Sequence, residues 1–217
     1  ETGDGLAMGK KIGAGTINLD LVKQYPQGVE TLPHHALAAT ASSTDTMKKS
    51  GAIYVNRDGK RIVDELAGLG TLTKITEAQK DSIMYIVMDK AAWKQYVAKS
   101  LEDKLVAAPS DLDKWAKIVN NGYPVMATSA KLADAAKTMG INAKGLQATI
   151  DRWNGFVKAG ADKDFGRKVL MPFGEGPYYI VEQKPRFQTT LGGLKANADM
   201  QILNKKGQPI GNLFGAG

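Results

Sequence analysis

Few residues of this sequence have side chains suited to catalysis or metal binding. It contains no cysteine, which excludes a disulfide framework, a thiolate zinc site and a cysteine nucleophile. Its two histidines, His34 and His35, are adjacent, and a metal site would need further ligands that the sequence does not indicate. We therefore predict no metal site and expect both histidines to lie exposed in a long loop.

Three short glycine-containing motifs could indicate phosphate binding or kinase chemistry. Gly3-Asp4-Gly5 with Gly9 lacks the spacing of a GxGxxG dinucleotide turn, and Gly9-Lys10 lacks the spacing and the hydroxyl residue of a P-loop. Asp164-Phe165-Gly166 has none of the other kinase motifs around it. Taken singly, each motif is typical of an ordinary turn.

The composition indicates a globular chain and limits its partners. The 217 residues are 43% hydrophobic and 24% charged. No apolar run approaches the roughly 20 residues that a membrane span requires. The formal charge of +7 comes from scattered lysines and arginines, without an RNP or zinc-finger pattern. We expect neither nucleic-acid binding nor a membrane span, and the cellular compartment stays open.

Strand-like and helix-like segments together predict a mixed α+β fold. A glycine turn at 2–5 leads into a short helix that ends at Gly13, and Asp89 is expected to cap the helix after a buried strand over 82–88. Asn142 or Ala143 is expected to begin a longer helix. The other predictions are a helix in the second half of 36–49, a hairpin over 52–63 with its turn at 57–59, helices over 111–120 and 131–139 capped by Ser110 and Ser129, a strand over 178–182, and a hairpin over 198–213 with its turn at 204–207.

Motifs that are weak singly form a specific series when they are taken in order. The series is TGDGLAMGKKIGA (2–14), GAIYVNRDGKRIVDE (51–65), DFGR (164–167), PYY (177–179), TLGGLKANADMQILN (190–204) and NLFGAG (212–217). From end to end it resembles the FAD-dependent fumarate reductase and succinate dehydrogenase flavoproteins, especially the flavocytochrome c and urocanate reductase types. The resemblance implies an oxidoreductase that uses FAD.

The resemblance also implies how the chain divides into domains. Residues 26–186 would form an α+β substrate-capping domain, and residues 1–25 and 187–217 would be hairpin and strand pieces of an incomplete FAD-binding domain. The family's GxGxxG motif is absent, and both termini fall inside glycine turns. We therefore expect a segment of a longer flavoprotein, inactive and without FAD until the remainder of the FAD domain is supplied.

The same resemblance implies which residues approach the flavin. Glycines at such positions let the backbone come close to the cofactor because they lack a Cβ. The implied residues are Thr2, Gly3, Asp4 and Gly5 in the first turn, Gly192 and Gly193 beside the isoalloxazine ring, and Gly215, Ala216 and Gly217 at the start of the final FAD turn.

The implied substrate-binding positions differ from the fumarate reductase pattern. Tyr25 stands where fumarate reductases have a histidine before proline, and Asp45, after Thr44, stands where they have a glutamate. Both differences resemble urocanate reductase, where a carboxylate would suit an imidazole-bearing substrate. Tyr25 could equally be a surface tyrosine and Asp45 a helix-capping group. Gln188 replaces one of the family's paired histidines and could hydrogen-bond a carboxylate.

The family's proton donor is missing. Its catalytic arginine lies four residues after Glu65, where this sequence has Leu69, and leucine neither donates a proton nor binds a carboxylate. Lys48, in place of a family arginine, and Asp45 are candidates for a proton relay, although lysine does not reproduce the planar fork of arginine. Loss of a general acid typically lowers a rate about 10²- to 10⁴-fold.

The implied activity of the longer protein is FAD-dependent reduction of a small α,β-unsaturated carboxylate, such as fumarate or urocanate, by hydride from flavin N5. A cap that expels water would strengthen the electrostatic contacts with this anion. Leu69 and Gln188 leave open a family member with a different substrate or without reductase activity. A further alternative is a non-catalytic ligand-binding module built on the cap alone.

Overall fold

The chain folds into two compact units. The computed structural model describes residues 3–216. The larger unit is Tyr25–Arg186, and the smaller unit combines Glu1–Gln24 with Phe187–Gly217. The chain passes from one unit to the other within strands β2 (Val22–Leu32) and β9 (Tyr178–Thr190).

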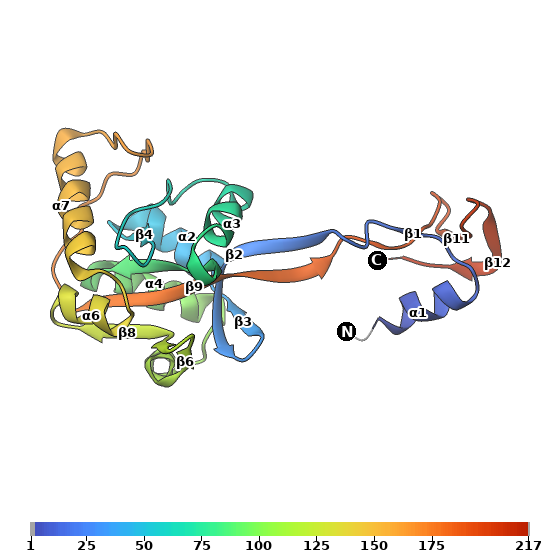
Figure 1. Cartoon of the computed structure of the whole chain (residues 1–217), viewed down its shortest axis with the longest axis horizontal. Coiled ribbons are helices and arrows are strands. Elements are labelled where there is room, and N and C mark those ends of the chain that lie inside the picture. Colours follow the sequence, from blue (N-terminus) through green and yellow to red (C-terminus); the bar gives the residue numbers. More distant parts are fainter. Residues whose placement is uncertain (1–2, 217) are drawn as a thin grey trace. The chain divides into compact units, whose positions relative to one another are not determined.

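A six-stranded antiparallel sheet forms the centre of the larger unit. Its strand order is β3-β2-β9-β5-β4, and β8 pairs with β9 beside this path (Figure 1). In the pairing of β5 with β9, Met84 lies opposite Gln183 and Met88 opposite Tyr179. The strands not yet bounded are β3 (His35–Ala38), β4 (Ile53–Val55), β5 (Met84–Met88) and β8 (Met126–Ser129).

Both faces of this sheet are buried, which explains why β5 has the apolar sequence MYIVM. Alternate side chains of a strand point to opposite faces. Met84 and Ile86 accordingly pack in one cluster with side chains of α2, α3 and α4, whereas Tyr85 and Val87 pack in a second cluster with side chains of α6 and α7. These helices are α2 (Thr40–Lys49), α3 (Leu69–Glu77), α4 (Lys90–Glu102), α6 (Leu132–Thr138) and α7 (Ala143–Ala159).

The predicted helix cap at Asp89 and the predicted start of the longer helix at Asn142 or Ala143 are confirmed. The Asp89 carboxylate accepts a hydrogen bond of 2.7 Å from the amide of Ala92 in the first turn of α4. The Asn142 side chain accepts one of 3.0 Å from the amide of Gly145 in α7. Each bond satisfies an amide that has no acceptor within its own helix.

The predicted helix over 111–120 is wrong in extent and in its cap. Helix α5 runs over Pro109–Lys114 and is followed by the 3₁₀ helix η2 (Trp115–Lys117) and the strands β6 (Val119–Asn120) and β7 (Tyr123–Pro124). The carboxylate of Asp111, not the hydroxyl of Ser110, closes the N-terminus by accepting from the amides of Ala107 and Ala108. Positive φ angles at Asn121 and Gly122 then form the turn between β6 and β7.

The N-cap predicted for the next helix is also wrong. Lys131 is the N-cap residue of α6, and the Ser129 hydroxyl instead accepts a hydrogen bond of 3.2 Å from the Lys131 amide. Ser129 therefore lies two residues before the N-cap position and does not reach the first-turn amides. It serves as the last residue of β8.

Two hairpins differ from the sequence predictions. The return strand expected after β4 is reduced to a single bridge between Val55 and Arg61, and the Arg61 side chain forms ion pairs with Glu65 and Asp162. The segment containing the histidines is not a long loop, since β2 and β3 form an antiparallel hairpin around it. His34 lies in its turn with φ 63° and His35 begins β3; both side chains are exposed, as expected.

The smaller unit contains one helix and two short antiparallel pairs of strands within its described residues. The predicted first helix is confirmed as α1 (Asp4–Lys11), and the predicted second hairpin is confirmed as β11 (Gln201–Leu203) with β12 (Pro209–Phe214). The pairing of β1 (Thr16–Ile17) with β10 (Gly193–Leu194) was not predicted, because strands so short leave no periodicity in a sequence. Over residues 3–216, no helix is both long and apolar enough to cross a bilayer.

Candidate functional site

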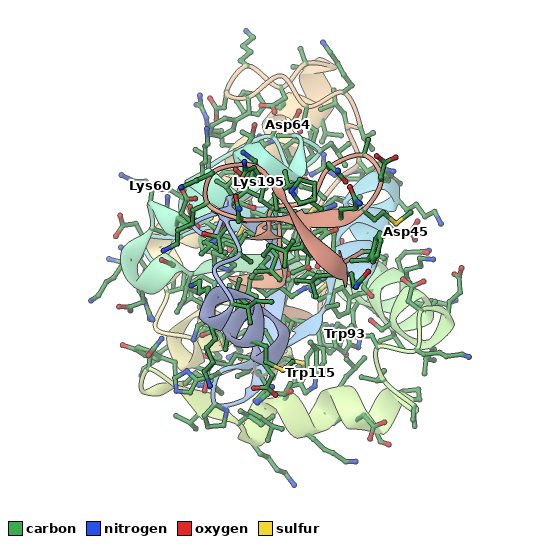
Figure 2. The ribbon with its side chains drawn as sticks, turned by 90° about the vertical axis from the view of Figure 1, so that its right-hand side faces the viewer. Asp45, Lys60, Asp64, Trp93, Trp115 and Lys195 are labelled. Atoms are coloured by element: carbon green, nitrogen blue, oxygen red, sulfur yellow. The ribbon has the colours of Figure 1, made fainter. Side chains whose placement is uncertain are left out.

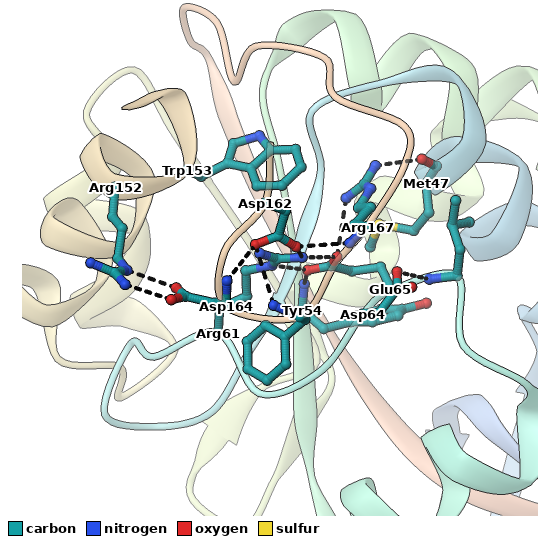
Figure 3. Close-up of polar contacts among 12 residues, drawn as sticks. Met47, Tyr54, Arg61, Asp64, Glu65, Arg152, Trp153, Asp162, Asp164 and Arg167 are labelled. Atoms are coloured by element: carbon teal, nitrogen blue, oxygen red, sulfur yellow. Dashed lines mark hydrogen bonds and ion pairs between the residues drawn. The ribbon is translucent and has the colours of Figure 1, made fainter. Parts of the chain in front are cut away.

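Two of the sequence motifs meet in a buried ion-pair network of the larger unit (Figure 3). Glu65 accepts hydrogen bonds of 2.7 and 2.8 Å from the guanidinium of Arg61 and one of 3.2 Å from Arg167. Arg61 also donates to Asp162 over 2.9 Å. The motif over 51–65 is thereby joined to DFGR at 164–167, more than a hundred residues later in the chain.

The network fixes the charge state of Asp162. Burial alone would raise the pKa of this carboxyl, but the Arg61 guanidinium and the Arg167 amide, which donates to it over 3.0 Å, hold the pKa to about 2. Asp162 is therefore ionised in the folded protein at neutral pH. Its other oxygen accepts from the amide of Asp164 and so shapes the turn that delivers Arg167.

Arg167 connects this network to the end of α2. Its side chain is fully buried, and it donates to the carbonyl oxygens of Ala52 and Ser50 at 2.7 and 2.9 Å and to that of Met47. Met47 lies in the last turn of α2, where the backbone carbonyls receive no hydrogen bond from an amide of the same helix. The ring of Trp153 lies 4.9 Å from the Arg167 guanidinium. These contacts position α2 against the sheet.

Helix α2 carries three of the residues predicted from the sequence. Thr44 and Asp45 are half-buried and Lys48 is exposed. The Asp45 carboxylate forms its ion pair with Lys49, one turn later, at 2.9 Å. Figure 2 labels the side chain of Asp45. The Asp45 carboxylate is thus in contact with a cation. Asp45 does not cap the helix, because the N-cap residue of α2 is Ala39. The relay through Lys48 stays a prediction.

Leu69 is the first residue of α3, and its side chain is 37% exposed. Glu65, four residues earlier, is buried and committed to Arg61 and Arg167. Leu69, which stands where the resemblance implies a catalytic arginine, is therefore an accessible apolar side chain without a proton to donate.

Tyr25 and Arg186 are the residues at which the chain enters and leaves the larger unit. The Arg186 guanidinium lies 4.8 Å from the centre of the Tyr25 ring, in stacking distance. Arg186 was missed by the sequence predictions. The signal that could have found it is the alternation Glu182, Lys184, Arg186, which places charged residues on one side of β9.

Gln188 and the predicted flavin-contacting residues belong to the smaller unit. Gln188 lies exposed on β9 in the smaller unit, whereas Tyr25, Thr44 and Asp45 belong to the larger unit. Gly3 has φ 75° and precedes α1, which begins with Asp4 and Gly5. Gly215 and Ala216 are exposed, and the Gly215 amide donates to the carbonyl of Met200. Thr2 and Gly217 lie outside the described residues.

The adjacent glycines of the TLGG motif have different physical roles. A Cβ on Gly192 would overlap the backbone of Ile17 and Asn18, so this glycine is required for packing within its own unit. A Cβ on Gly193 would meet no atom within 4 Å. Of these two glycines, Gly193 is the one that leaves open space beside the backbone, which a planar cofactor could occupy. Gly3 and Gly5 leave similar open space.

The part of the chain that the structure describes holds no group of three or more metal-ligating side chains. The described residues do include a buried ion-pair network, a helix (α2) with one acidic and two basic residues, and an arginine, Arg186, stacked on Tyr25. These groups suit the recognition of a small charged molecule better than covalent catalysis by a protein side chain.

Comparison with known proteins agrees with this description. The model of the FAD binding domain family matches residues 1–217. Urocanate reductase from Eggerthella lenta is 32% identical over 218 residues, which cover 100% of this chain and 33% of that protein. Fumarate reductase (cytochrome) from Shewanella frigidimarina is 31% identical over 216 residues, which cover 99% of this chain and 34% of that protein.

Solved structures give the same relationship. The open conformation of a flavocytochrome c3 fumarate reductase matches with a TM-score of 0.75 and 27% identity, over 100% of this chain and 34% of that one. The solution structure of a fumarate reductase flavoprotein subunit from Lactobacillus plantarum matches with a TM-score of 0.57 and 35% identity, over 68% of this chain and 90% of that one.

The fold and the match over all 217 residues are those of a flavoprotein family. The chain belongs to the FAD binding domain family. It spans about a third of the length of the urocanate and fumarate reductases that it matches.

Proposed function

We propose that the larger unit is the substrate-capping domain, and the smaller unit part of the FAD-binding domain, of a flavin-dependent reductase of α,β-unsaturated carboxylates. The preferred substrate is urocanate-like. The observation that carries this proposal is the match of the whole chain to a urocanate reductase, together with Tyr25 and Asp45 at the positions that distinguish such an enzyme from fumarate reductases.

The flavin would lie against the smaller unit. In support, a Cβ on Gly3, Gly5 or Gly193 would meet no atom within 4 Å, and the first-turn amides of α1 have no acceptor within the helix. When it is bound, FAD supplies the hydride that reduces the carbon–carbon double bond. The residues of this chain bind and orient the substrate and supply the proton.

In the larger unit, α2 supplies the acidic group. The Asp45 carboxylate, with Lys49 beside it at 2.9 Å, accepts a hydrogen bond from the N–H of an imidazole ring. Asp45 and Lys48 carry the proton, because Leu69 has none to give. The buried anchor of Arg167 holds α2 in position for this role.

One experiment tests the proposal directly. The full-length protein that carries this chain is reconstituted with FAD and mixed without oxygen with reduced methyl viologen. We expect urocanate to oxidise the dye faster than fumarate does. A protein that binds FAD and reduces neither compound would contradict the proposal.

The exposed side chain of Leu69 favours a second candidate, a family member with a different unsaturated substrate. Its apolar surface would contact a substrate group that is neither anionic nor imidazole-like. Oxidation of the dye by uncharged enones, with no response to urocanate or fumarate, would favour this candidate.

A further inference from the structure

Alternate residues of β9 place three charged side chains on one side of the strand. Two of them are neutralised within the larger unit. The Lys184 ammonium lies 2.6 Å from a carboxylate oxygen of Glu30 and 3.3 Å from one of Glu182. Arg186, two residues further, has no carboxylate at salt-bridge distance among residues 3–216, and its Nε is buried without a hydrogen-bond partner. The end of this series is thus an uncompensated cation.

The position of Arg186 is built by its neighbours. The Tyr25 ring lies 4.8 Å from the guanidinium, and stacking on an aromatic ring restricts the plane of the fork. A Cβ on Gly28 would lie 2.8 Å from the Lys184 carbonyl oxygen and 3.1 Å from the Arg186 Cβ, so glycine at 28 lets β2 approach β9 at this point. The guanidinium is therefore held by packing and not by a counter-charge.

A half-buried charge without a partner is unfavourable, because it loses hydration and gains no ion pair. Burial accordingly lowers the pKa of Arg186, while the neighbouring Tyr25 opposes the shift. An anion that accepts hydrogen bonds from the guanidinium would remove this penalty. The planar fork of arginine matches the two oxygens of a carboxylate or of a phosphate.

We propose that Arg186, stacked on Tyr25 and without a carboxylate partner, binds the carboxylate of the unsaturated substrate. This inference rests on the function proposed above and assigns it a residue. Arg186, on strand β9, supplies the planar cation that Leu69 on helix α3 cannot supply. A phosphate of the cofactor has the same chemistry, and the experiment separates the two sources.

The test uses the full-length protein with FAD and compares Arg186→Gln and Arg186→Lys with the wild type. Arg152→Gln is the matched control, because it removes the same charge from a side chain that is 61% exposed and paired with Asp164. Calorimetric titration gives the dissociation constants of urocanate and of its methyl ester, which lacks the carboxylate. The flavin absorbance of the purified proteins gives their FAD content.

We expect Arg186→Gln to weaken urocanate binding about 10- to 100-fold, as for the loss of a hydrogen bond to a charged group. The wild type should prefer urocanate to the ester, and Arg186→Gln should lose that preference, with an intermediate result for Arg186→Lys. A residue that served the fold alone would weaken both ligands equally. FAD content and the control variant should match the wild type.

Two results would overturn the inference. One is an unchanged preference for urocanate over the ester in Arg186→Gln. The other is a loss of FAD from Arg186→Gln with urocanate binding intact, which would assign the anion to the cofactor. A wild type that neither binds nor reduces urocanate or fumarate would refute the proposed function itself, whereas an active and unaltered Arg186→Gln refutes only the role of Arg186.

Discussion

Replacing Arg167 with leucine tests whether the buried network holds the larger unit together. The substitution removes donors from three carbonyls and from Glu65 while it leaves the volume of the side chain partly filled. Removing one partner of a buried ion pair typically destabilises a protein by about 3–5 kcal/mol. Because native domains are stable by only about 5–15 kcal/mol, this is a large fraction of the total.

The expected result is a lower midpoint of urea denaturation for Arg167→Leu, followed by tryptophan fluorescence. Trp153 lies 4.9 Å from the Arg167 guanidinium and 4.7 Å from that of Arg61, so its emission reports on this site directly. Arg167→Lys keeps the charge and should lose less stability, although lysine cannot bond the carbonyls as a fork.

Arg152→Gln is the control for this prediction, since its ion pair with Asp164 is largely exposed and such pairs contribute little. We expect its midpoint to stay close to that of the wild type. If Arg167→Leu unfolds at the same urea concentration as Arg152→Gln, the network does not stabilise the unit and α2 is positioned by its apolar face alone.

Three further predictions follow from individual residues. The pKa of Asp162 is lowered from an ordinary 3.8 to about 2 in the folded protein. Its contribution to the free energy of unfolding is therefore complete above about pH 4 and is lost as the pH falls toward 2. The shift corresponds to about 2 kcal/mol, and a pH series of unfolding free energies should show this slope in the wild type and lose it in Asp162→Asn. Gly192→Ala should lower the melting temperature, because the new Cβ overlaps the backbone of Asn18 and such overpacking costs about 1–3 kcal/mol. Gly193→Ala places its Cβ in open space, so this variant should melt like the wild type and should bind FAD more weakly. Equal melting of the two glycine variants would refute that distinction. Leu69→Arg, at an exposed position, should raise the rate of fumarate reduction by the full-length protein at least about tenfold, while Leu69→Gln should not; equal rates would show that position 69 lacks the role that the family resemblance implies.

Local signals in the sequence determined many of the elements. Asp89 caps its helix and the longer helix begins at Ala143, both as predicted, because a helix start depends on residues only a few positions apart. Where two local signals compete, the sequence was misleading. Ser110 and Asp111 are both capping residues, and the longer side chain of Asp111 reaches the free amides.

The ordered series of motifs also identified the family, which the match over residues 1–217 confirms. It did so because glycines and charged residues at turns keep their order along the chain, whatever their contacts are. The family resemblance that the series carries also implied the residues of the candidate site. It did not show what those residues contact, and Gly192 illustrates the difference, since packing within its own unit explains its lack of a side chain.

Only the tertiary structure decided the contacts between distant segments. Arg61 meets Asp162, 101 residues away, and Arg167 reaches the end of α2 across 120 residues. Arg186 has no distinguishing motif, and it stands out only because Lys184 takes the nearby carboxylates of Glu30 and Glu182. Such pairings depend on which strands become neighbours in the sheet. The burial of apolar faces over the whole unit determines this arrangement, and no short stretch of sequence contains it.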